Sequence, residues 1–301
     1  MKRVVSVSLG SHLRDHSAQL TVLGETVAVY RQGTDGDLAA ARGLIAKLAA
    51  RRAVDAIGLG GIDRYLVVAG RRYEIRDAQA LAEAAGTVPV VDGSGVKATW
   101  EPRVVERLLE AGRLHVGQRV LMVSALDRFG MAEAFFGLGF ATVAGDLIFG
   151  SRINYPIRSL LELEEMARKL LPEMVKLPFS QLYPVGDQQT AEPDRRFARY
   201  FAEADVIAGD FHYIRRYLPD DLTDKTVITN TTTAHDVKLL EARAIRCLVT
   251  TTPVLGGRSF GANLVEAALV AVSGIDADHP EWPGLVERAG LTFSVRDWRE
   301  G

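Results

Sequence analysis

The stretch VLMVSALDRFGMAEAFFGLGFATVAGDL, Val120–Leu147, decides the fold of the second half of the chain. A β-branched apolar run, a tight turn, an apolar helical segment and a second β-branched run follow one another, and an acid stands near the end. This order predicts a strand–turn–helix–strand unit of a parallel sheet. It is also the outline of a dinucleotide-binding unit, whose first turn usually has the pattern GxGxxG.

The turn of this unit departs from that pattern at two of the three glycine positions. Ala125 and Asp127 stand where the first two glycines are expected, and Gly130 stands at the third. Asp127 would place a negative charge beside the pyrophosphate, which Arg128 would partly offset. Asp146 lies 21 positions after Ala125, at the spacing of the acid that binds the ribose. A nucleotide site and a plain βαβ unit with a solvated turn both remain open.

Strands and helices alternate about five times in the second half, whereas the first half mixes hairpins with helices. The chain is therefore predicted to have an α/β fold with two domains: a mixed α/β substrate domain over 1–115, and a doubly wound, Rossmann-like parallel-sheet domain with a small C-terminal α-β tail over 116–301. Ligands of such sheets lie at the carboxyl ends of the strands, near the switch in strand order. A polar, proline-rich segment at 178–194 predicts a long loop, a kind that is often functional.

Composition narrows the class of protein. The 301 residues have a net charge of −2 and are 48% hydrophobic, and the sequence pI is about 6.3. A nucleic-acid binder would show a basic face or tail. Cys247 is the only cysteine, which excludes an intrachain disulfide and a cysteine-based zinc site. With no signal peptide and no apolar stretch long enough for a membrane span, we expect a cytoplasmic protein with a small-molecule partner, no metal, no nucleic acid and no membrane. A homo-oligomer is compatible with the sequence.

Polar residues end two neighbouring strands of the predicted sheet. Asn230, Thr231 and Thr232 follow one of them, and a second threonine run follows the next. Hydroxyls at this edge can bind a ligand. In the alternative, Thr233 caps the following helix and has no other role.

The loop after the second threonine run predicts an anion site. It places glycines, an arginine and a serine at the start of a helix, where backbone N–H groups and the helix dipole favour negative charge. Arg258 would bind a carboxylate or phosphate through two hydrogen bonds, and the alternative is a turn with an arginine in solvent. The residues assigned to this site are Gly257, Arg258, Ser259 and Asn263.

Two pairs of titratable residues are candidates for proton transfer. Asp210 and His212 lie at the end of the strand predicted at 205–211, and histidine is the usual proton carrier near neutral pH. Asp92 and Lys97 follow a strand of the first domain, next to glycines that permit close approach to the backbone. The alternatives are helix capping and packing for the first pair, and turn chemistry with a surface lysine for the second.

Six stretches have a familiar combination of residues: GTDGDL, DAIGLGGID, VVDGSG, GDFHYIRRYLP, TVITNTTTAHDV and TTTPVLGGRSFGANLVEA. Together they resemble a bacterial family known as quinate 5-dehydrogenase, and the resemblance covers nearly the whole chain. It implies kinship with shikimate and quinate dehydrogenases, in which a Lys–Asp pair moves a proton while hydride passes to NAD(P). Lys97 and Asp92 are the positional candidates for that pair. The implied cofactor-binding residues are Ser124, Asp127, Arg128, Gly130, Asp146, Asn230, Thr231 and Thr232.

Three functions follow, in order of preference. The first is an NAD(P)-dependent dehydrogenase of a small polyhydroxy acid, with Asp146 favouring NAD over NADP. The second is a non-redox transferase or lyase that binds an anionic or phosphorylated molecule between its domains, at Arg258. The third is a ligand-binding protein without catalysis.

Overall fold

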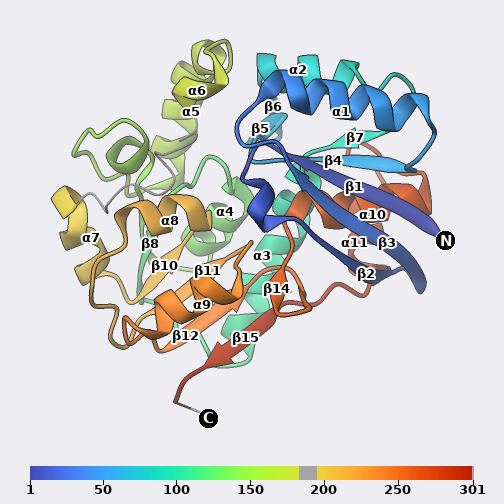
Figure 1. Cartoon of the computed structure of the whole chain (residues 1–301). Coiled ribbons are helices and arrows are strands. Elements are labelled where there is room, and N and C mark those ends of the chain that lie inside the picture. The colour runs from blue at the N-terminus through green and yellow to red at the C-terminus, as the bar shows by residue number, and fades with distance from the viewer. Residues whose placement is uncertain (183–194, 300–301) are drawn as a thin grey trace. The chain divides into compact units, whose positions relative to one another are not determined.

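The computed structural model describes residues 1–182 and 195–299, which form two compact α/β units (Figure 1). As far as it is described, the first unit combines Met1–Thr99, Leu171–Gln188 and Gly261–Leu291, and the second combines Trp100–Leu170, Gln189–Phe260 and Thr292–Gly301. The predicted α/β class with two domains is confirmed. The first division between the two units falls between Thr99 and Trp100, within the continuous helix α3 (Ser94–Glu110). The sequence placed this boundary near residue 115.

The first unit has a five-stranded sheet in the order β2-β3-β1-β4-β7, in which β2 is antiparallel to β3 and the other pairs are parallel. The strands are β1 (Lys2–Ser8), β2 (His16–Val22), β3 (Glu25–Gly33), β4 (Ala56–Gly60) and β7 (Val90–Val91). The predicted hairpin joins β2 to β3 through Leu23 and Gly24, both with positive φ, as a two-residue hairpin turn requires. A second hairpin pairs β5 (Tyr65–Val68) with β6 (Arg71–Glu74).

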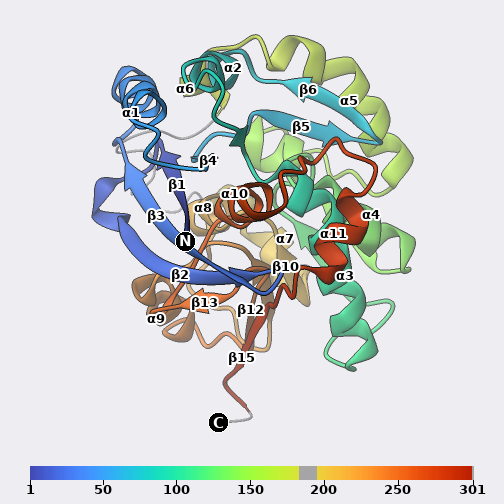
Figure 2. The ribbon, with the colours of Figure 1, turned by 90° about the vertical axis from the view of Figure 1, so that its right-hand side faces the viewer.

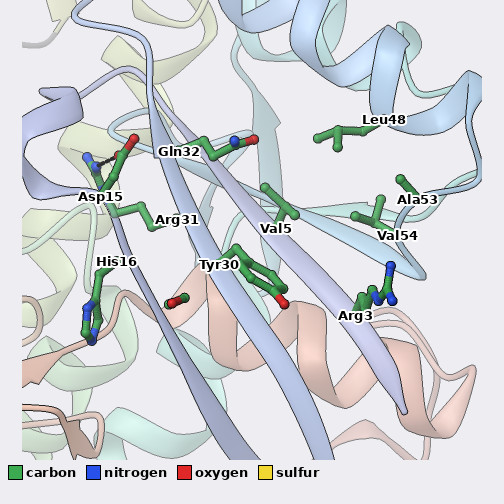
Figure 3. Close-up of a pocket in the computed structure, with 11 residues that line it drawn as sticks. Arg3, Val5, Asp15, His16, Tyr30, Arg31, Gln32, Leu48, Ala53 and Val54 are labelled. Carbon is green, nitrogen blue, oxygen red and sulfur yellow. Dashed lines mark hydrogen bonds and ion pairs between the residues drawn. The ribbon is translucent and has the colours of Figure 1, made fainter.

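Helices cover both faces of this sheet. Helices α1 (Leu38–Ala50) and α2 (Arg76–Glu83) lie on one face and α10 (Ala262–Ser273) lies on the other (Figures 1 and 2). Asp37 caps α1 by accepting a 2.9 Å hydrogen bond from the Ala40 N–H. Helix α1 reaches over β1 but leaves a groove over β3 (Figure 3). The unit also contains a 3-10 helix (His12–Arg14), α6 (Phe179–Leu182) and α11 (Trp282–Arg288).

The second unit has a six-stranded sheet in the order β15-β12-β11-β10-β8-β9, parallel except for β15. Its strands are β8 (Arg119–Met122), β9 (Ala141–Ala144), β10 (Val206–Ala208), β11 (Thr226–Thr229), β12 (Cys247–Thr250) and β15 (Ser294–Asp297). The chain moves outward from β8 to β9 and then returns to place β10 on the other side of β8. The strand order therefore reverses between β8 and β10, and this reversal is the topological switch point of a doubly wound sheet.

The helices of the second unit include α4 (Phe129–Gly137), α5 (Leu160–Met174, whose end belongs to the first unit), α7 (Ala198–Glu203), α8 (Phe211–Tyr217) and α9 (Ala234–Glu241). A short hairpin of β13 (Val254–Leu255) and β14 (Arg258–Ser259) precedes α10. The core of the second unit is aromatic. The centroid of the Phe149 ring lies 5.6 Å from that of Phe201 and 4.9 Å from that of Tyr217. Strand β9 ends at Ala144, and a π-helix (Asp146–Gly150) follows.

Three further findings concern membrane spans, metal sites and the loop predicted at 178–194. In the part of the chain that the structure describes, no helix has both the length and the apolar composition needed to cross a membrane. Residues 1–182 and 195–299 also bring together no group of three His, Cys, Asp or Glu side chains that could hold a metal ion. Most of the loop predicted at 178–194 lies outside the described residues, and its first part forms α6.

Candidate functional site

The candidate site lies at the switch point of the second unit, where β8, β10 and β11 end side by side. The Ser124 hydroxyl, after β8, accepts a 3.1 Å hydrogen bond from the Asp210 backbone N–H, after β10. Asp210 also begins α8, because its Oδ1 accepts a hydrogen bond from the His212 N–H at 2.8 Å. From the end of β11, the Asn230 side-chain amide donates to Asp210 Oδ2 at 3.4 Å. Three consecutive strand ends thus bring predicted residues together.

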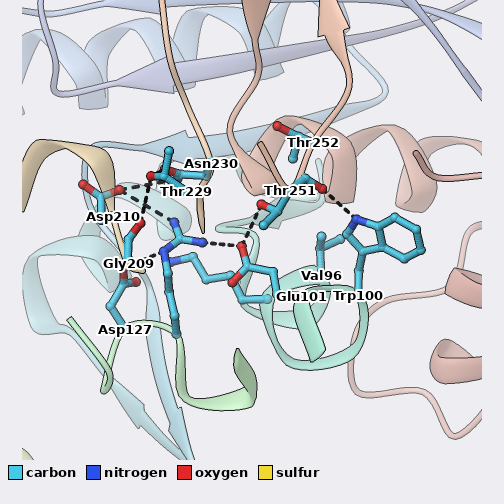
Figure 4. A network of polar contacts seen from close by, with 12 residues as sticks. Val96, Trp100, Glu101, Asp127, Gly209, Asp210, Thr229, Asn230, Thr251 and Thr252 are labelled. Carbon is cyan, nitrogen blue, oxygen red and sulfur yellow. Dashed lines mark hydrogen bonds and ion pairs between the residues drawn. The ribbon is translucent and has the colours of Figure 1, made fainter. Parts of the chain in front are cut away.

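Arg128 is the buried centre of this cluster, with 0% of its side chain exposed. Its Nη1 bonds the Glu101 carboxylate, and its Nε and Nη2 lie 3.6 Å from Asp127 Oδ2 and 3.7 Å from Asp210 Oδ2 (Figure 4). Both distances exceed those of hydrogen bonds, and within the described residues Nε and Nη2 have no hydrogen-bond partner. Buried N–H groups without an acceptor are rare and costly. Two donors of Arg128 are therefore unsatisfied next to two carboxylates.

The cluster places three carboxylates around one guanidinium. Burial favours a lower pKa for Arg128, but the carboxylates of Glu101, Asp127 and Asp210 together raise its pKa above the ordinary value, so it stays protonated. Burial, followed by Asp127 and Asp210, also raises the pKa of Tyr213, which therefore keeps its phenolic proton at neutral pH. Three carboxylates around one guanidinium disfavour a further anion.

Glu101 was absent from the candidates drawn from the sequence. Its Oε1 accepts a 3.2 Å hydrogen bond from the Thr251 hydroxyl, and the Thr251 carbonyl accepts one from Trp100 Nε1 at 2.7 Å (Figure 4). Helix α3 begins at Ser94 and contains Pro102 in its interior. Glu101 therefore projects from the middle of a helix into the core.

Asp146 closes the turn after β8. Its Oδ1 accepts a hydrogen bond from the Leu126 N–H at 2.9 Å, and its Oδ2 accepts one from the Ala125 N–H at 3.2 Å. A bound pyrophosphate would need backbone N–H groups of this turn. Burial raises the pKa of Asp146 to about 6, although these hydrogen bonds act to lower it. A side chain of the protein fills the turn, and its residues do not fit NAD.

Other predicted cofactor residues hold the fold together. Gly130 is buried in the first turn of α4. The Ser259 hydroxyl accepts a hydrogen bond from the Thr232 N–H and donates one to the Asn230 carbonyl, both at 2.7 Å. Thr233 caps α9 in a reciprocal capping box with Asp236. This capping role is the alternative to ligand binding that the sequence offered. Beside Asn230, Thr231 is half-buried.

The predicted anion loop is a tight β-hairpin. Gly256 and Gly257 have φ of 61° and 78° and connect β13 to β14, as a two-residue turn requires. Arg258 and Ser259 form β14, with Ser259 fully buried. Asn263 belongs to the first unit, where its Nδ2 donates to the Ser6 hydroxyl at 2.6 Å. Ser259 and Asn263 are each engaged in hydrogen bonds within their own unit.

In the first unit, Lys97 pairs with Asp63 and not with Asp92. The Lys97 Nζ and Asp63 Oδ1 lie 2.5 Å apart, and both residues are buried. Asp92 instead accepts hydrogen bonds at 2.7, 2.7 and 3.0 Å from three backbone N–H groups, those of Arg64, Tyr65 and Ser94. Its carboxylate fixes a loop, so the expected Lys97–Asp92 pair does not form.

Two glycines of the first unit allow helix α10 to pack closely against the backbone. A Cβ at Gly58 would lie 2.7 Å from the Asn263 carbonyl oxygen, and a Cβ at Gly93 would lie 2.5 Å from the Asn263 nitrogen. Close backbone approach was predicted, and the approaching element is α10. The same helix carries Glu266, which is 2% exposed and accepts a 2.8 Å hydrogen bond from the Val96 N–H at the start of α3. A single acid in the apolar run NLVEAALV was the sequence signal for it.

Comparisons with known proteins give a family without an assigned function. Residues 95–298 match the family model described as "Domain of unknown function (DUF8754)", and residues 3–92 match "Domain of unknown function (DUF8753)". No curated protein matches the sequence.

Several solved structures of low similarity also match. A Mycobacterium smegmatis protein in complex with β-D-fucofuranose is 12% identical, with 100% of this chain and 92% of that chain covered and a TM-score of 0.36. The arabinose-binding protein AraP of Geobacillus stearothermophilus is 10% identical over 83% and 81%, with a TM-score of 0.41. The leucine-binding protein LivK of Thermotoga maritima is 11% identical over 99% and 95%, with a TM-score of 0.40. Likeness at this level supports no conclusion about ligand or activity.

The expected dehydrogenase is wrong. The models that match the chain are described as domains of unknown function and not as quinate 5-dehydrogenase. The structure gives the physical reason: Asp146 occupies the N–H groups that a pyrophosphate would need, and Lys97 is paired with Asp63. The assignment as an NAD-dependent oxidoreductase is therefore withdrawn.

Proposed function

We propose that this chain, which belongs to the DUF8754 family, is a non-catalytic protein that binds a small, neutral, hydroxyl-rich molecule in its second unit. The observation that supports this most directly is the position of Arg128. Its unsatisfied Nη2 lies 3.7 Å from Asp210 Oδ2, at the switch point where ligands of doubly wound sheets bind. Asp210 and Asp127 are the partly exposed members of the cluster, with 22% and 14% of their side chains exposed.

A hydroxyl group suits this arrangement because it both accepts and donates a hydrogen bond. Its proton can go to Asp210 or Asp127, the partly exposed carboxylates that flank the buried Arg128. An anion at this edge would face the carboxylates of Asp210 and Asp127, so a polyol or sugar suits the site better than a phosphate or carboxylic acid.

The roles of the same residues within the fold support binding without catalysis. Arg128 stays protonated, because the surrounding carboxylates raise its pKa, so it cannot serve as a base. Asp210 uses Oδ1 to cap α8. A hydrogen-bonded carboxylate held in this way is suited to orient a ligand hydroxyl.

The test is the thermal midpoint of the full chain with D-ribose, L-arabinose, D-galactose and myo-inositol, set against ribose 5-phosphate, quinate and NAD. At least one neutral polyol is expected to raise the midpoint, because a ligand at about 100 times its Kd adds roughly 2.7 kcal/mol of stability. Quinate, NAD and the sugar phosphate are expected to give no shift. A shift with NAD, or none with any neutral polyol, would contradict the proposal.

A matched pair of variants locates the site. Asp210→Asn keeps the α8 cap, because asparagine caps as well as aspartate, but it replaces one carboxylate oxygen with a donor. Asp220→Asn removes an exposed carboxylate that pairs with Arg195 away from the cluster. The polyol shift is expected to disappear in Asp210→Asn and to persist in Asp220→Asn. Equal shifts in both would place the ligand elsewhere.

A further inference from the structure

The groove beside α1 follows from the register of three strands in the first unit. Val5 of β1 pairs with Tyr30 of β3, and Tyr30 pairs with Ser17 of β2. Their side chains therefore form one row on one face of the sheet. Val5 is 5% exposed and Tyr30 is 42% exposed, because α1 reaches over β1 but not over β3. The groove therefore lies over β3, on the part of this sheet face that α1 does not cover.

This hollow has the size of a small-molecule site. Its volume is about 500 Å³, within the range of about 300–1,000 Å³ that is usual for ligand pockets. One wall is apolar and consists of Leu48, Ala53 and Val54, which lie across from Tyr30 in Figure 3. Arg3 and Gln32 add polar groups on either side of Tyr30.

The polar groups around Tyr30 are exposed to solvent, so a ligand can replace the water that they bind. Within residues 1–182 and 195–299, the Arg3 guanidinium, the Tyr30 hydroxyl and the Gln32 amide have no hydrogen-bond or ion-pair partner. The other charges of the lining neutralise each other, since Arg31 Nη1 and Asp15 Oδ1 lie 2.9 Å apart. Arg3 therefore leaves the groove with a net positive charge.

We propose that this groove binds a small aromatic carboxylate. The carboxylate bonds Arg3, whose guanidinium can donate two parallel hydrogen bonds, and the ring stacks between Tyr30 and the apolar wall. Residues two apart on a strand are separated by about 7 Å, so the rows of Arg3 and Tyr30 are spaced as a benzoate requires. Gln32, one row further, bonds a polar substituent at the far end of the ring. The groove shares no residue with the cluster around Arg128, so this site is independent of the proposed function.

Isothermal titration calorimetry on the full chain tests the ligand class with four probes. Benzoate and 4-hydroxybenzoate are expected to bind, and the second more tightly because its hydroxyl reaches Gln32. Benzamide lacks the charge and acetate lacks the ring, so both are expected to bind at least about tenfold more weakly. Absence of heat with both aromatic carboxylates at millimolar concentration would overturn the proposal, as would benzamide binding as tightly as benzoate.

Four variants then assign the contacts. Arg3→Gln removes the charge but keeps the backbone hydrogen bond of Arg3 to Asp55, and it is expected to weaken benzoate binding about tenfold. Tyr30→Leu is expected to weaken it similarly, whereas Tyr30→Phe keeps the ring and is expected to retain binding. Lys47→Gln removes an exposed cation of α1 outside the groove and should leave binding unchanged. If Arg3→Gln and Lys47→Gln bind benzoate alike, the carboxylate does not bind at Arg3 and the site is disproved.

Discussion

The Asp146 carboxylate and the Leu126 backbone N–H are joined by a 2.9 Å hydrogen bond across the turn that follows β8. In Asp146→Ala this N–H loses its partner, and so does that of Ala125. We expect the free energy of unfolding, measured with urea, to fall by about 1–3 kcal/mol. An unchanged value would mean that the turn is held by other contacts.

The raised pKa of Asp146 also predicts that the free energy of unfolding depends on pH. Its pKa is about 6 in the folded chain and about 3.9 when unfolded, so the folded state binds more protons between these values. The stability contributed by this group is therefore greatest below about pH 4 and is lost as the pH rises through about 6. Asp146→Ala should lack this part of the decline, which urea denaturation between pH 4 and 7 would reveal.

Glu266 extends the same effect to higher pH. Burial, followed by the nearby Asp92 carboxylate, raises its pKa to about 8, against the lowering effects of the Val96 and Gly93 N–H groups and of Lys97. The folded state again holds the extra proton, so stability should decline as the pH rises from about 4.3, the pKa of an unfolded glutamate, through about 8, with a slope of up to about 1.4 kcal/mol per pH unit.

Glu266→Gln tests this assignment, because glutamine can still accept the Val96 hydrogen bond but does not ionise. Its unfolding free energy should be flatter over this pH range than that of the natural chain. Glu83→Gln replaces an exposed acid of α2 and should keep the natural slope. Parallel slopes for the natural chain and Glu266→Gln would assign the titration to another group.

Arg128 and Glu101 should behave as a coupled pair. Arg128→Met leaves the Glu101 carboxylate buried without its cation, and such a loss usually costs about 3–5 kcal/mol. In the double variant Glu101→Leu/Arg128→Met both charges disappear, and the cost should be well below the sum of the two single variants. A double-mutant cycle by urea denaturation measures this difference, and additivity would show that the two side chains act independently.

Alanine substitutions at Gly93 and Gly86 separate the cost of backbone strain from the cost of displacing a packed helix. Both have positive φ, 92° and 59°, but only a Cβ at Gly93 would meet α10, whereas one at Gly86 would have no atom within 4 Å. Gly86→Ala should cost about 1–2 kcal/mol of strain. Gly93→Ala should cost about 1–3 kcal/mol more, because α10 must move. Similar unfolding midpoints for the two variants would mean that α10 yields easily.

The alternation of strands and helices was enough to predict the parallel sheet of the second unit and the strand ends at which Asp210 and Asn230 lie. It could not predict that α10 packs on the first sheet, because an all-round apolar helix shows that it is buried but not against which strands. The roles of Glu101 and Glu266 were missed for a related reason. A buried acid depends on partners distant in sequence, such as Thr251 for Glu101 and Val96 for Glu266. Asp146 had the spacing of a ribose ligand, but only the coordinates show its carboxylate bonded to its own turn.

The hydrogen bond between Asn263 and Ser6 has a consequence for the order of events during synthesis. A ribosome adds about 5–20 residues per second, so β1 waits on the order of ten seconds or more before α10 emerges to cover it. During that time, the face formed by residues such as Val4, which is 0% exposed in the finished fold, has no partner helix. The second unit, whose parallel strands all precede α10, can assemble first, and the N-terminal sheet becomes the last part of the chain to mature.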